Sequence, residues 1–265
     1  MLLANPFTKA LWDARRSIVG WGLTIGGIAV MYTAFYPSIS KPSFAEALKN
    51  YPESIKKAFN MQDLTTPQGY LESYIFGLMV PILLAVFVII SGTRAIAGDE
   101  EAGTLDLILA HPASRPGVLL SRLAALVTEV LIICGVVYVL LLAIAGPTKI
   151  SPVGAGHIAA ATIQLAFFGI LFAALTLGVG AATGRRAAAI GTGVAVMVLG
   201  WFANSLAPQV HGLEWAQRLS PFHYYLGGQP LVNGFDPGGS AVLLGVAAVV
   251  VVAGLVRFRS RDLAV

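Results

Sequence analysis

The sequence Gly98-Asp-Glu-Glu-Ala-Gly-Thr-Leu-Asp-Leu-Ile-Leu-Ala-His-Pro-Ala-Ser-Arg115 lies between two long apolar runs and holds the densest acidic cluster of the chain. Gly103 breaks the element that precedes it, and the hydroxyl of Thr104 is suited to cap a new helix. Apolar residues at i, i+3 and i+4 then give this helix one apolar face, formed by Leu105, Ile108 and Leu109. The pattern predicts a short amphipathic helix at 104–110.

The flanking residues support this helix and limit its length. Asp106 falls in its first turn, where the helix dipole favours a negative charge. Pro112 stops it, and Ser114 can cap the next helix with Pro116 in its first turn. A helix this short is not stable alone, so one that offers leucines and carboxylates needs another protein to dock against.

The same stretch resembles the first cytoplasmic loop of type-2 ABC (ATP-binding-cassette) transporter permeases. The usual pattern of that loop is two acidic residues, one or two further residues, Gly-Thr-Leu, an acidic residue and Leu-Leu-Leu, followed by Pro-x-Ser-Arg. In that family the loop carries a coupling helix that touches a separate ATPase subunit. The resemblance implies such a contact at Glu100, Glu101, Gly103, Thr104, Leu105, Leu109, Pro112 and Arg115, and the candidate coupling residues also include Asp99, Asp106 and Ile108 of the same stretch. The alternative is an ordinary solvated loop in an unrelated membrane protein.

The composition is that of a membrane protein. Hydrophobic residues make up 57% of the chain and charged residues 11%, whereas soluble domains carry about 25% charged residues. The mean hydropathy is +0.79. The net charge of +4 does not indicate nucleic acid as a partner, because the positive residues cluster beside apolar segments. Cys134 is the only cysteine, which excludes an intrachain disulfide.

Six apolar runs approach or exceed the length of about 20 residues that a helix needs to cross a bilayer. The predicted spans are 18–36, 73–93, 120–145, 158–183, 187–207 and 239–256. They lack the alternation of polar and apolar residues that β-barrel strands show. The sequence therefore predicts an all-α membrane protein with one transmembrane domain over residues 1–265.

Small residues four positions apart recur within these spans, a spacing that lets helix backbones approach closely in lipid. The pairs are Gly22 with Gly26, Gly169 with Ala173, Gly180 with Gly184, and Gly191 with Ala195. They indicate packing between helices and do not identify a ligand.

Residues 1–17 precede the first predicted span. Phe7 and Leu11 recur at helical spacing, with Lys9 and Asp13 on the other face, which predicts an interfacial helix. The charges are followed by no small-residue cleavage site after the apolar run, so we expect the segment to remain in the mature protein.

The lysine and arginine distribution predicts the orientation. If the N-terminus is cytoplasmic, 11 of the 17 lysines and arginines lie in inner segments. The positive-inside rule therefore places both termini in the cytoplasm of a multi-pass protein of the cell (plasma) membrane.

Two outer segments carry further patterns. Apolar residues at helical spacing in 37–72 predict one or two helices broken near Pro52. Residues 220–228, Ser-Pro-Phe-His-Tyr-Tyr-Leu-Gly-Gly, resemble the re-entrant extracellular segment that the permease family places before its last helix. His211 and His223 have no cysteine or close carboxylate cluster beside them, so no metal site is predicted.

Glu129 lies about ten residues into the third predicted span, roughly 15 Å along the helix. An ionisable group at that depth costs several kcal/mol unless it is paired, hydrated or protonated. One interpretation places it, with Gln164, on the path of a transported compound. The other makes it a structural residue that forms a hydrogen bond to Gln164 or Thr128.

The functional prediction combines the resemblance with what the chain lacks. No Gly-x-x-x-x-Gly-Lys-[Ser/Thr] loop is present, so we expect a transporter subunit that is not an enzyme and that holds no cofactor. The expected function is export of a hydrophobic or amphipathic compound, such as a drug, a peptide or a lipid-like molecule. Mg-ATP would bind to a partner, the ABC ATPase subunit, and further expected partners are the lipid bilayer and a second copy of this permease or a related one. The alternatives are an ion-coupled secondary transporter or channel and a non-transporting membrane sensor or scaffold.

Overall fold

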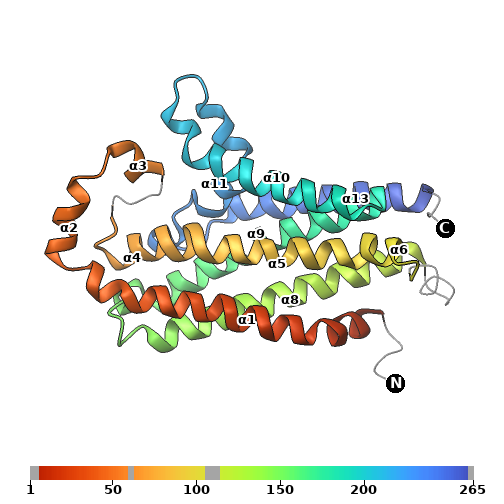
Figure 1. Ribbon diagram of the computed structural model, residues 1–265, viewed down its shortest axis with the longest axis horizontal. Coiled ribbons are helices and arrows are strands. Elements are labelled where there is room, and N and C mark those ends of the chain that lie inside the picture. The colour runs from red at the N-terminus through yellow and green to blue at the C-terminus, as the bar shows by residue number, and fades with distance from the viewer. Residues whose placement is uncertain (1–5, 59–62, 105–113, 262–265) are drawn as a thin grey trace.

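The computed structural model describes residues 6–58, 63–104 and 114–261. Long helices run side by side along one axis and form an elongated bundle (Figure 1). Six of the described helices are long and apolar enough to cross a membrane: Pro6–Ile39, Pro67–Glu101, Arg115–Ile144, Ala155–Thr183, Arg186–Gln209 and Pro237–Ser260. Each of the six predicted spans overlaps one of them. The described part of the chain contains no strand, so the predicted all-α membrane fold is confirmed.

The second long helix is assembled from several pieces. They are α4 (Pro67–Tyr70), wide π-helical turns (Leu71–Met79), α5 (Val80–Thr93), another wide segment (Arg94–Gly98) and α6 (Asp99–Glu101). Wide turns of this kind are frequent at functional sites. One of the two lies near each end of the bundle, and the end with α6 is called the α6 end below.

The other long helices are α1 (Pro6–Ile39), α8 (Arg115–Ile144), α9 (Ala155–Thr183), α10 (Arg186–Ser205) and α13 (Pro237–Ser260). Helix α9 is the centre of the bundle, because it packs against α5, α8, α10 and α13. Aromatic side chains fill one part of this core. The Phe168 ring centroid lies 4.8 Å from that of Phe172 and 4.8 Å from that of Phe222.

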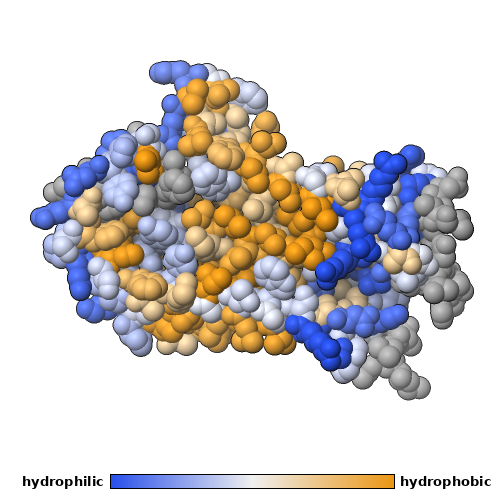
Figure 2. All heavy atoms as spheres, in the orientation of Figure 1, coloured by the Kyte–Doolittle hydropathy of each residue, from blue (hydrophilic) through white to orange (hydrophobic). Residues whose placement is uncertain are grey.

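The outside of the bundle is apolar in its middle. Side chains such as Leu23 of α1, Leu199 of α10 and Val249 of α13 are at least 66% exposed. Figure 2 shows that apolar side chains cover the middle of the face that it presents, whereas hydrophilic side chains gather toward both ends. This arrangement suits a bilayer, in which exposed apolar side chains contact lipid or another transmembrane helix.

The N-terminal segment differs from the expectation. Helix α1 runs without a break from Pro6 to Ile39, so residues 6–17 form the first part of the first long helix and not a separate element. No strong helix breaker lies between residue 6 and Pro37, and hence the polar beginning and the apolar run continue as one helix.

The opposite end of the bundle, called the α2 end, carries most of the short helices. As predicted, two helices flank Pro52, namely α2 (Pro42–Lys49) and α3 (Glu53–Ala58). Short 3-10 helices follow at Ser151–Val153, Ala207–Gln209 and Glu214–Leu219, together with α11 (Pro221–Leu226) and α12 (Pro230–Asn233). Helix α11 packs against α9 and α13, and its Phe222 and Tyr225 side chains are buried.

One close helix contact pairs glycines on two different helices. A Cβ atom added at Gly254 of α13 would lie 2.7 Å from the Cα of Gly178 on α9, and one added at Gly178 would lie 2.9 Å from the carbonyl oxygen of Val250. Only some of the small residues predicted to mediate helix packing lie at contacts between helices. Gly26 and Gly169 face side chains of neighbouring helices, whereas Gly191 has no atom within 4 Å of an added Cβ.

We expect Gly254→Ala to lower the free energy of unfolding by about 1–3 kcal/mol, because the added methyl group meets main-chain atoms that cannot rotate away. The matched control is Gly245→Ala in the same helix, where nothing lies within 4 Å of the added Cβ. Alanine also has the higher helix propensity, so the control should be neutral or stabilising. Unfolding in mixed micelles measures both, and equal effects of the two substitutions would contradict this packing.

Candidate coupling site

The acidic triplet Asp99–Glu101 forms the last helical turn of the second long helix. The helix ends at Gly103, which has a φ of 66°. The N–H of Thr104 donates to the carbonyl of Asp99, and the N–H of Gly103 donates to that of Glu100. These two bonds form a Schellman cap, which favours glycine at the left-handed position. The prediction that Gly103 ends this element is confirmed.

The two predicted helix caps beside this stretch, Thr104 and Ser114, differ in what they bond to. The Thr104 hydroxyl donates to the Asp99 carbonyl over 3.0 Å, so it bonds to the helix that precedes it. Ser114 caps α8 as predicted, because its hydroxyl oxygen accepts the N–H of Gly117 over 3.2 Å. The predicted helix and its coupling residues Leu105, Asp106, Ile108, Leu109 and Pro112 lie outside the described residues.

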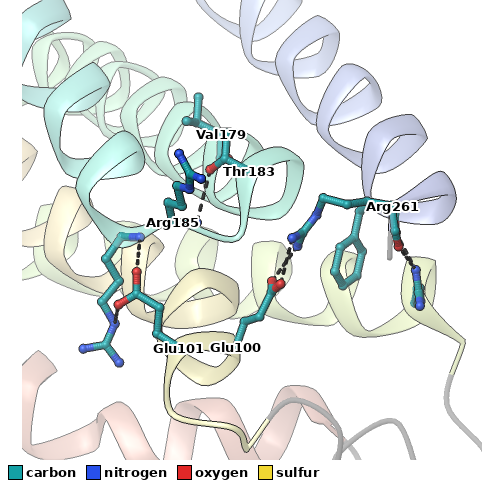
Figure 3. A network of polar contacts seen from close by, with 9 residues as sticks. Glu100, Glu101, Val179, Thr183, Arg185 and Arg261 are labelled. Atoms are coloured by element: carbon teal, nitrogen blue, oxygen red, sulfur yellow. Dashed lines mark hydrogen bonds and ion pairs between the residues drawn. The ribbon is translucent and has the colours of Figure 1, made fainter. Parts of the chain in front are cut away.

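Glu100 makes the most buried ion pair at this end. Arg261, directly after α13, donates one N–H over 2.7 Å to Oε1 of Glu100 and a second to Oε2 (Figure 3). Only 3% of the Glu100 side chain and 14% of the Arg261 side chain are exposed. Such a two-pronged arginine–carboxylate contact is among the stronger and more directional of protein hydrogen bonds.

Gly184 makes room for this pair. It ends α9 with a φ of 70°, and a Cβ added there would lie 2.6 Å from Oε1 of Glu100. The pair is therefore packed against the end of the central helix, and only glycine combines the required backbone conformation with the required space.

Glu101 joins the second long helix to α10. Its Oε1 accepts the main-chain N–H of Arg186 over 2.8 Å, and its Oε2 lies 3.2 Å from the Nε of the same arginine. Arg186 also donates over 2.7 Å to the Gly98 carbonyl. A carboxylate at the first residue of α10 suits the positive end of that helix dipole. Both side chains of this pair are 44% exposed.

Asp99 joins the second long helix to α8. Its Oδ2 accepts an N–H of Arg122 over 2.8 Å. Arg115, the first residue of α8, donates in turn to the carbonyls of Phe258 and Arg261 at the end of α13, over 3.1 and 2.7 Å. The guanidinium that was predicted to contact a partner is thus bonded within this chain.

Three consecutive carboxylates therefore pair with three arginines, one in α8, one in α10 and one directly after α13. We call this set the ionic clasp, and it consists of Asp99, Glu100, Glu101, Arg122, Arg186 and Arg261. It connects the second long helix to α8, α10 and α13 directly beside residues 105–113. Four long helices are therefore joined at this end of the bundle.

The acidic half of the clasp stands out in the sequence, whereas its pairing with arginines was not predicted. These arginines were explained by membrane orientation alone. A usable signal was nevertheless present, because the predicted orientation brings the acidic triplet and the arginines at the ends of the third, fifth and sixth spans to the same side of the bilayer.

Glu129 and Gln164 do not meet as the structural interpretation expected. Among the described residues, Oε2 of Glu129 has no hydrogen-bond partner, although the residue is 4% exposed. The hydroxyl of Thr128 donates to its own helix at Ala124. The Gln164 amide donates over 3.3 Å to the Asp236 carbonyl, and with its O and N atoms exchanged it bonds to the Tyr225 carbonyl over 2.9 Å. The hydrogen bond from Glu129 to Gln164 or Thr128 was therefore a wrong prediction.

We expect Glu129→Gln to leave the free energy of unfolding unchanged or to raise it, because the carboxylate oxygen has no partner to lose and the amide carries no charge to bury. The matched control is Gln164→Leu, which leaves main-chain groups without their partner and should cost about 1–3 kcal/mol. Chemical unfolding of the purified protein measures both. A clear loss of stability in Glu129→Gln would mean that the carboxylate has a bonded role.

Comparison with known proteins identifies the family. Residues 5–263 match the family model described as ABC-2 family transporter protein. No curated protein sequence matches the chain. Among the described residues, no group of three His, Cys, Asp or Glu side chains is placed to hold a metal ion.

Proposed function

From the premise that the chain belongs to the ABC-2 transporter family and is a membrane subunit of an ABC transporter, we propose that it is an exporter permease driven by a separate ATPase subunit. In this proposal the α6 end and both termini face the cytoplasm of the cell. The loop at 105–113 binds the ATPase, which carries the Mg-ATP. The ionic clasp is the observation that carries the proposal, because it pairs the residues before 105–113 with Arg122 of α8 and with Arg261. Arg115, which follows 105–113, adds a bond to the end of α13.

The clasp supports a direct transmission of movement. On the N-terminal side of the loop, Glu100 is held by Arg261. On the C-terminal side, Arg115 is held by the carbonyls at the end of α13. Both ends of the segment 105–113 are thus fixed to the helix bundle by hydrogen bonds. A displacement of this segment by the ATPase therefore moves α8 and α13 together with the second long helix.

ATP must favour one of two arrangements of the helices for this movement to perform transport. Closure of an ATPase dimer would press on two copies of the loop, one in each permease chain. The exposed apolar faces of α1, α10 and α13 leave surface for a second copy of this chain or for a related permease. Linkage then requires that the cargo and the nucleotide each bind one arrangement more tightly.

The test compares ATP hydrolysis by the purified chain with that of the complex isolated from its own membranes. We expect no hydrolysis by the chain alone, because it has no phosphate-binding loop. The complex should hydrolyse ATP, and vanadate should inhibit it. Nucleotide binding by the isolated chain would contradict the proposal.

A further inference from the structure

The chain turns back on itself directly after α10, at the α2 end of the protein. Residues 206–219, called the α10 hairpin below, turn at Gly212, where φ is 86°. The short helix Glu214–Leu219 then packs against Ala207–Gln209, α10 and α11. Figure 1 shows that this part of the chain projects sideways from the bundle.

One side of the α10 hairpin is polar and faces a cleft. This open cleft of about 1010 Å³ lies between α3, the wide turns Leu71–Met79, the end of α10 and α11. The hairpin contributes Pro208, Gln209 and Gln217 to its lining. The Gln209 amide donates over 2.9 Å to the Ser205 carbonyl, which fixes this wall to the end of α10.

The α10 hairpin also carries large apolar side chains that the protein itself does not cover. Between 38% and 73% of each is exposed, and none of them lines the cleft; they are Leu206, Val210, Leu213, Trp215 and Leu219. Exposed apolar surface that is concentrated in one segment marks a contact with a membrane or with another protein. The hairpin is therefore amphipathic, with its amide groups on the cleft and its apolar groups elsewhere.

This apolar surface continues an exposed row of α10. Val194, Val198, Phe202 and Leu206 follow one another at four-residue spacing, and each is between 38% and 48% exposed. Residues four positions apart lie on the same face of a helix. Figure 2 shows apolar side chains both on the part that projects sideways and on the adjoining middle of the bundle. The surface that α10 offers to the bilayer therefore extends onto the hairpin.

The length of α10 places the hairpin at the membrane interface. The helix has 20 residues, from Arg186 to Ser205, which correspond to about 30 Å at the helical rise. The hydrocarbon core of a bilayer has about the same thickness. Because Arg186 is ion-paired with Glu101 at the α6 end, the residues after Ser205 reach the headgroups of the opposite leaflet. Tryptophan is enriched at that level, and Trp215 is 61% exposed.

The charged residues of the hairpin fit the same placement. His211, Glu214 and Arg218 are exposed, and Nδ1 of His211 lies 3.8 Å from Oε1 of Glu214. An interfacial segment keeps such groups among the headgroups while its apolar side enters the boundary with the acyl chains by about 5–10 Å. A position in the hydrocarbon core would bury the charges, and a position in bulk water would leave the apolar side chains uncovered.

We infer that the α10 hairpin is an interfacial membrane anchor. Trp215 and Leu219 contact lipid at the boundary between headgroups and acyl chains, whereas Gln209 and Gln217 remain on the cleft. Lipid thereby holds one wall of the cleft at the level of the membrane surface. The inference goes beyond the proposed function and does not depend on it, since neither ATP nor an exported compound enters the argument. A hairpin covered by lipid leaves the apolar faces of α1 and α13 for a second permease.

The first test measures the lipid contact of Trp215 by fluorescence, with the full-length chain in lipid nanodiscs. The chain has four tryptophans, so the difference between the parent protein and Trp215→Phe isolates the emission of Trp215. We expect phosphatidylcholine brominated on its upper acyl carbons to quench this emission by roughly half, and iodide in the water to quench it little. Trp201→Phe is the matched control, because Trp201 lines the cleft and its emission should respond less to the brominated lipid. Emission of Trp215 that iodide quenches and the brominated lipid does not would overturn the inference.

The second test reverses the order of accessibility that the protein surface alone would give. Leu219 is 73% exposed, whereas Gln217 is partly buried beside the cleft. We expect a water-soluble maleimide to modify Leu219→Cys roughly tenfold more slowly than Gln217→Cys in nanodiscs, because lipid covers the first position and not the second. The natural Cys134 is buried and should add little background. A faster reaction at Leu219→Cys than at Gln217→Cys would contradict the anchor.

The number of copies in each nanodisc separates lipid from a protein partner. Nanodiscs that hold a single chain contain lipid and no second permease, so slow labelling of Leu219→Cys in them supports the anchor. Slow labelling only in nanodiscs that hold two chains would mean that a second copy covers the hairpin. That result would replace lipid as the partner of this surface and overturn the inference.

Discussion

Glu100→Ala should lower the free energy of unfolding by about 3–5 kcal/mol, because it leaves the guanidinium of Arg261 nearly buried and without its carboxylate. Unfolding of the purified protein in mixed micelles measures the loss. The reciprocal double variant, Glu100→Arg with Arg261→Glu, keeps a pair of opposite charges and should recover part of the stability.

The adjacent residue is the matched control. Glu101→Ala removes a carboxylate of the same triplet from a pair that is 44% exposed on both sides, and exposed pairs contribute about 0–1 kcal/mol. Similar small losses for both substitutions would show that the buried pair of the ionic clasp does not hold these helices together. The comparison separates burial from charge, since both residues are glutamates one position apart.

Leu105→Ala combined with Leu109→Ala should reduce the affinity for the ATPase subunit by roughly 30-fold or more and leave the stability of the chain unchanged. The sequence places both residues on the apolar face of the expected coupling helix. Truncating a fully enclosed leucine costs about 2–5 kcal/mol, and 1.4 kcal/mol corresponds to a tenfold change in affinity. Titration of the ATPase onto the permease in nanodiscs measures the dissociation constant.

The two predictions separate the two functions of this region. The Glu100 substitution should damage the fold, and the leucine substitutions should damage only the contact with the partner. Unchanged ATPase affinity in the leucine double variant would remove the loop at 105–113 from the coupling contact. It would leave the ionic clasp as a purely structural feature.

The long helices could be predicted from the sequence because their signal is local. Each predicted span is a run of apolar residues, and such a run forms a helix in lipid whatever its neighbours are. The positions of the helix ends were predicted less accurately. The second span was expected at 73–93, and the helix extends over Pro67–Glu101, because polar residues such as Glu72 and Asp99 continue the same helix outside the apolar run.

The ionic clasp could be predicted only in part, because its pairs join distant residues. Glu100 and Arg261 are 161 positions apart, and their contact depends on which helices are neighbours in the bundle. Composition and periodicity carry no information on that order. The acidic triplet was recognised as unusual, but its partners were expected outside the chain, and the structure pairs it within the chain.

The cleft at the α2 end could not be predicted from any single stretch of the sequence. Its walls come from α3, the second long helix, α10 and α11, which are far apart in the chain. The intramembrane residues Glu129 and Gln164 were more conspicuous in the sequence, because polar residues in spans are rare. These residues were conspicuous because burying a polar side chain in a span costs free energy. That cost does not show whether a ligand can reach the side chain.

The most direct test of the central claim is the mass and composition of the complex, measured by native mass spectrometry after purification from its own membranes. The account predicts two copies of a permease chain and two copies of an ABC ATPase subunit, with release of the ATPase from the Leu105→Ala and Leu109→Ala double variant. A stable assembly that contains this chain and no ATPase subunit would contradict it.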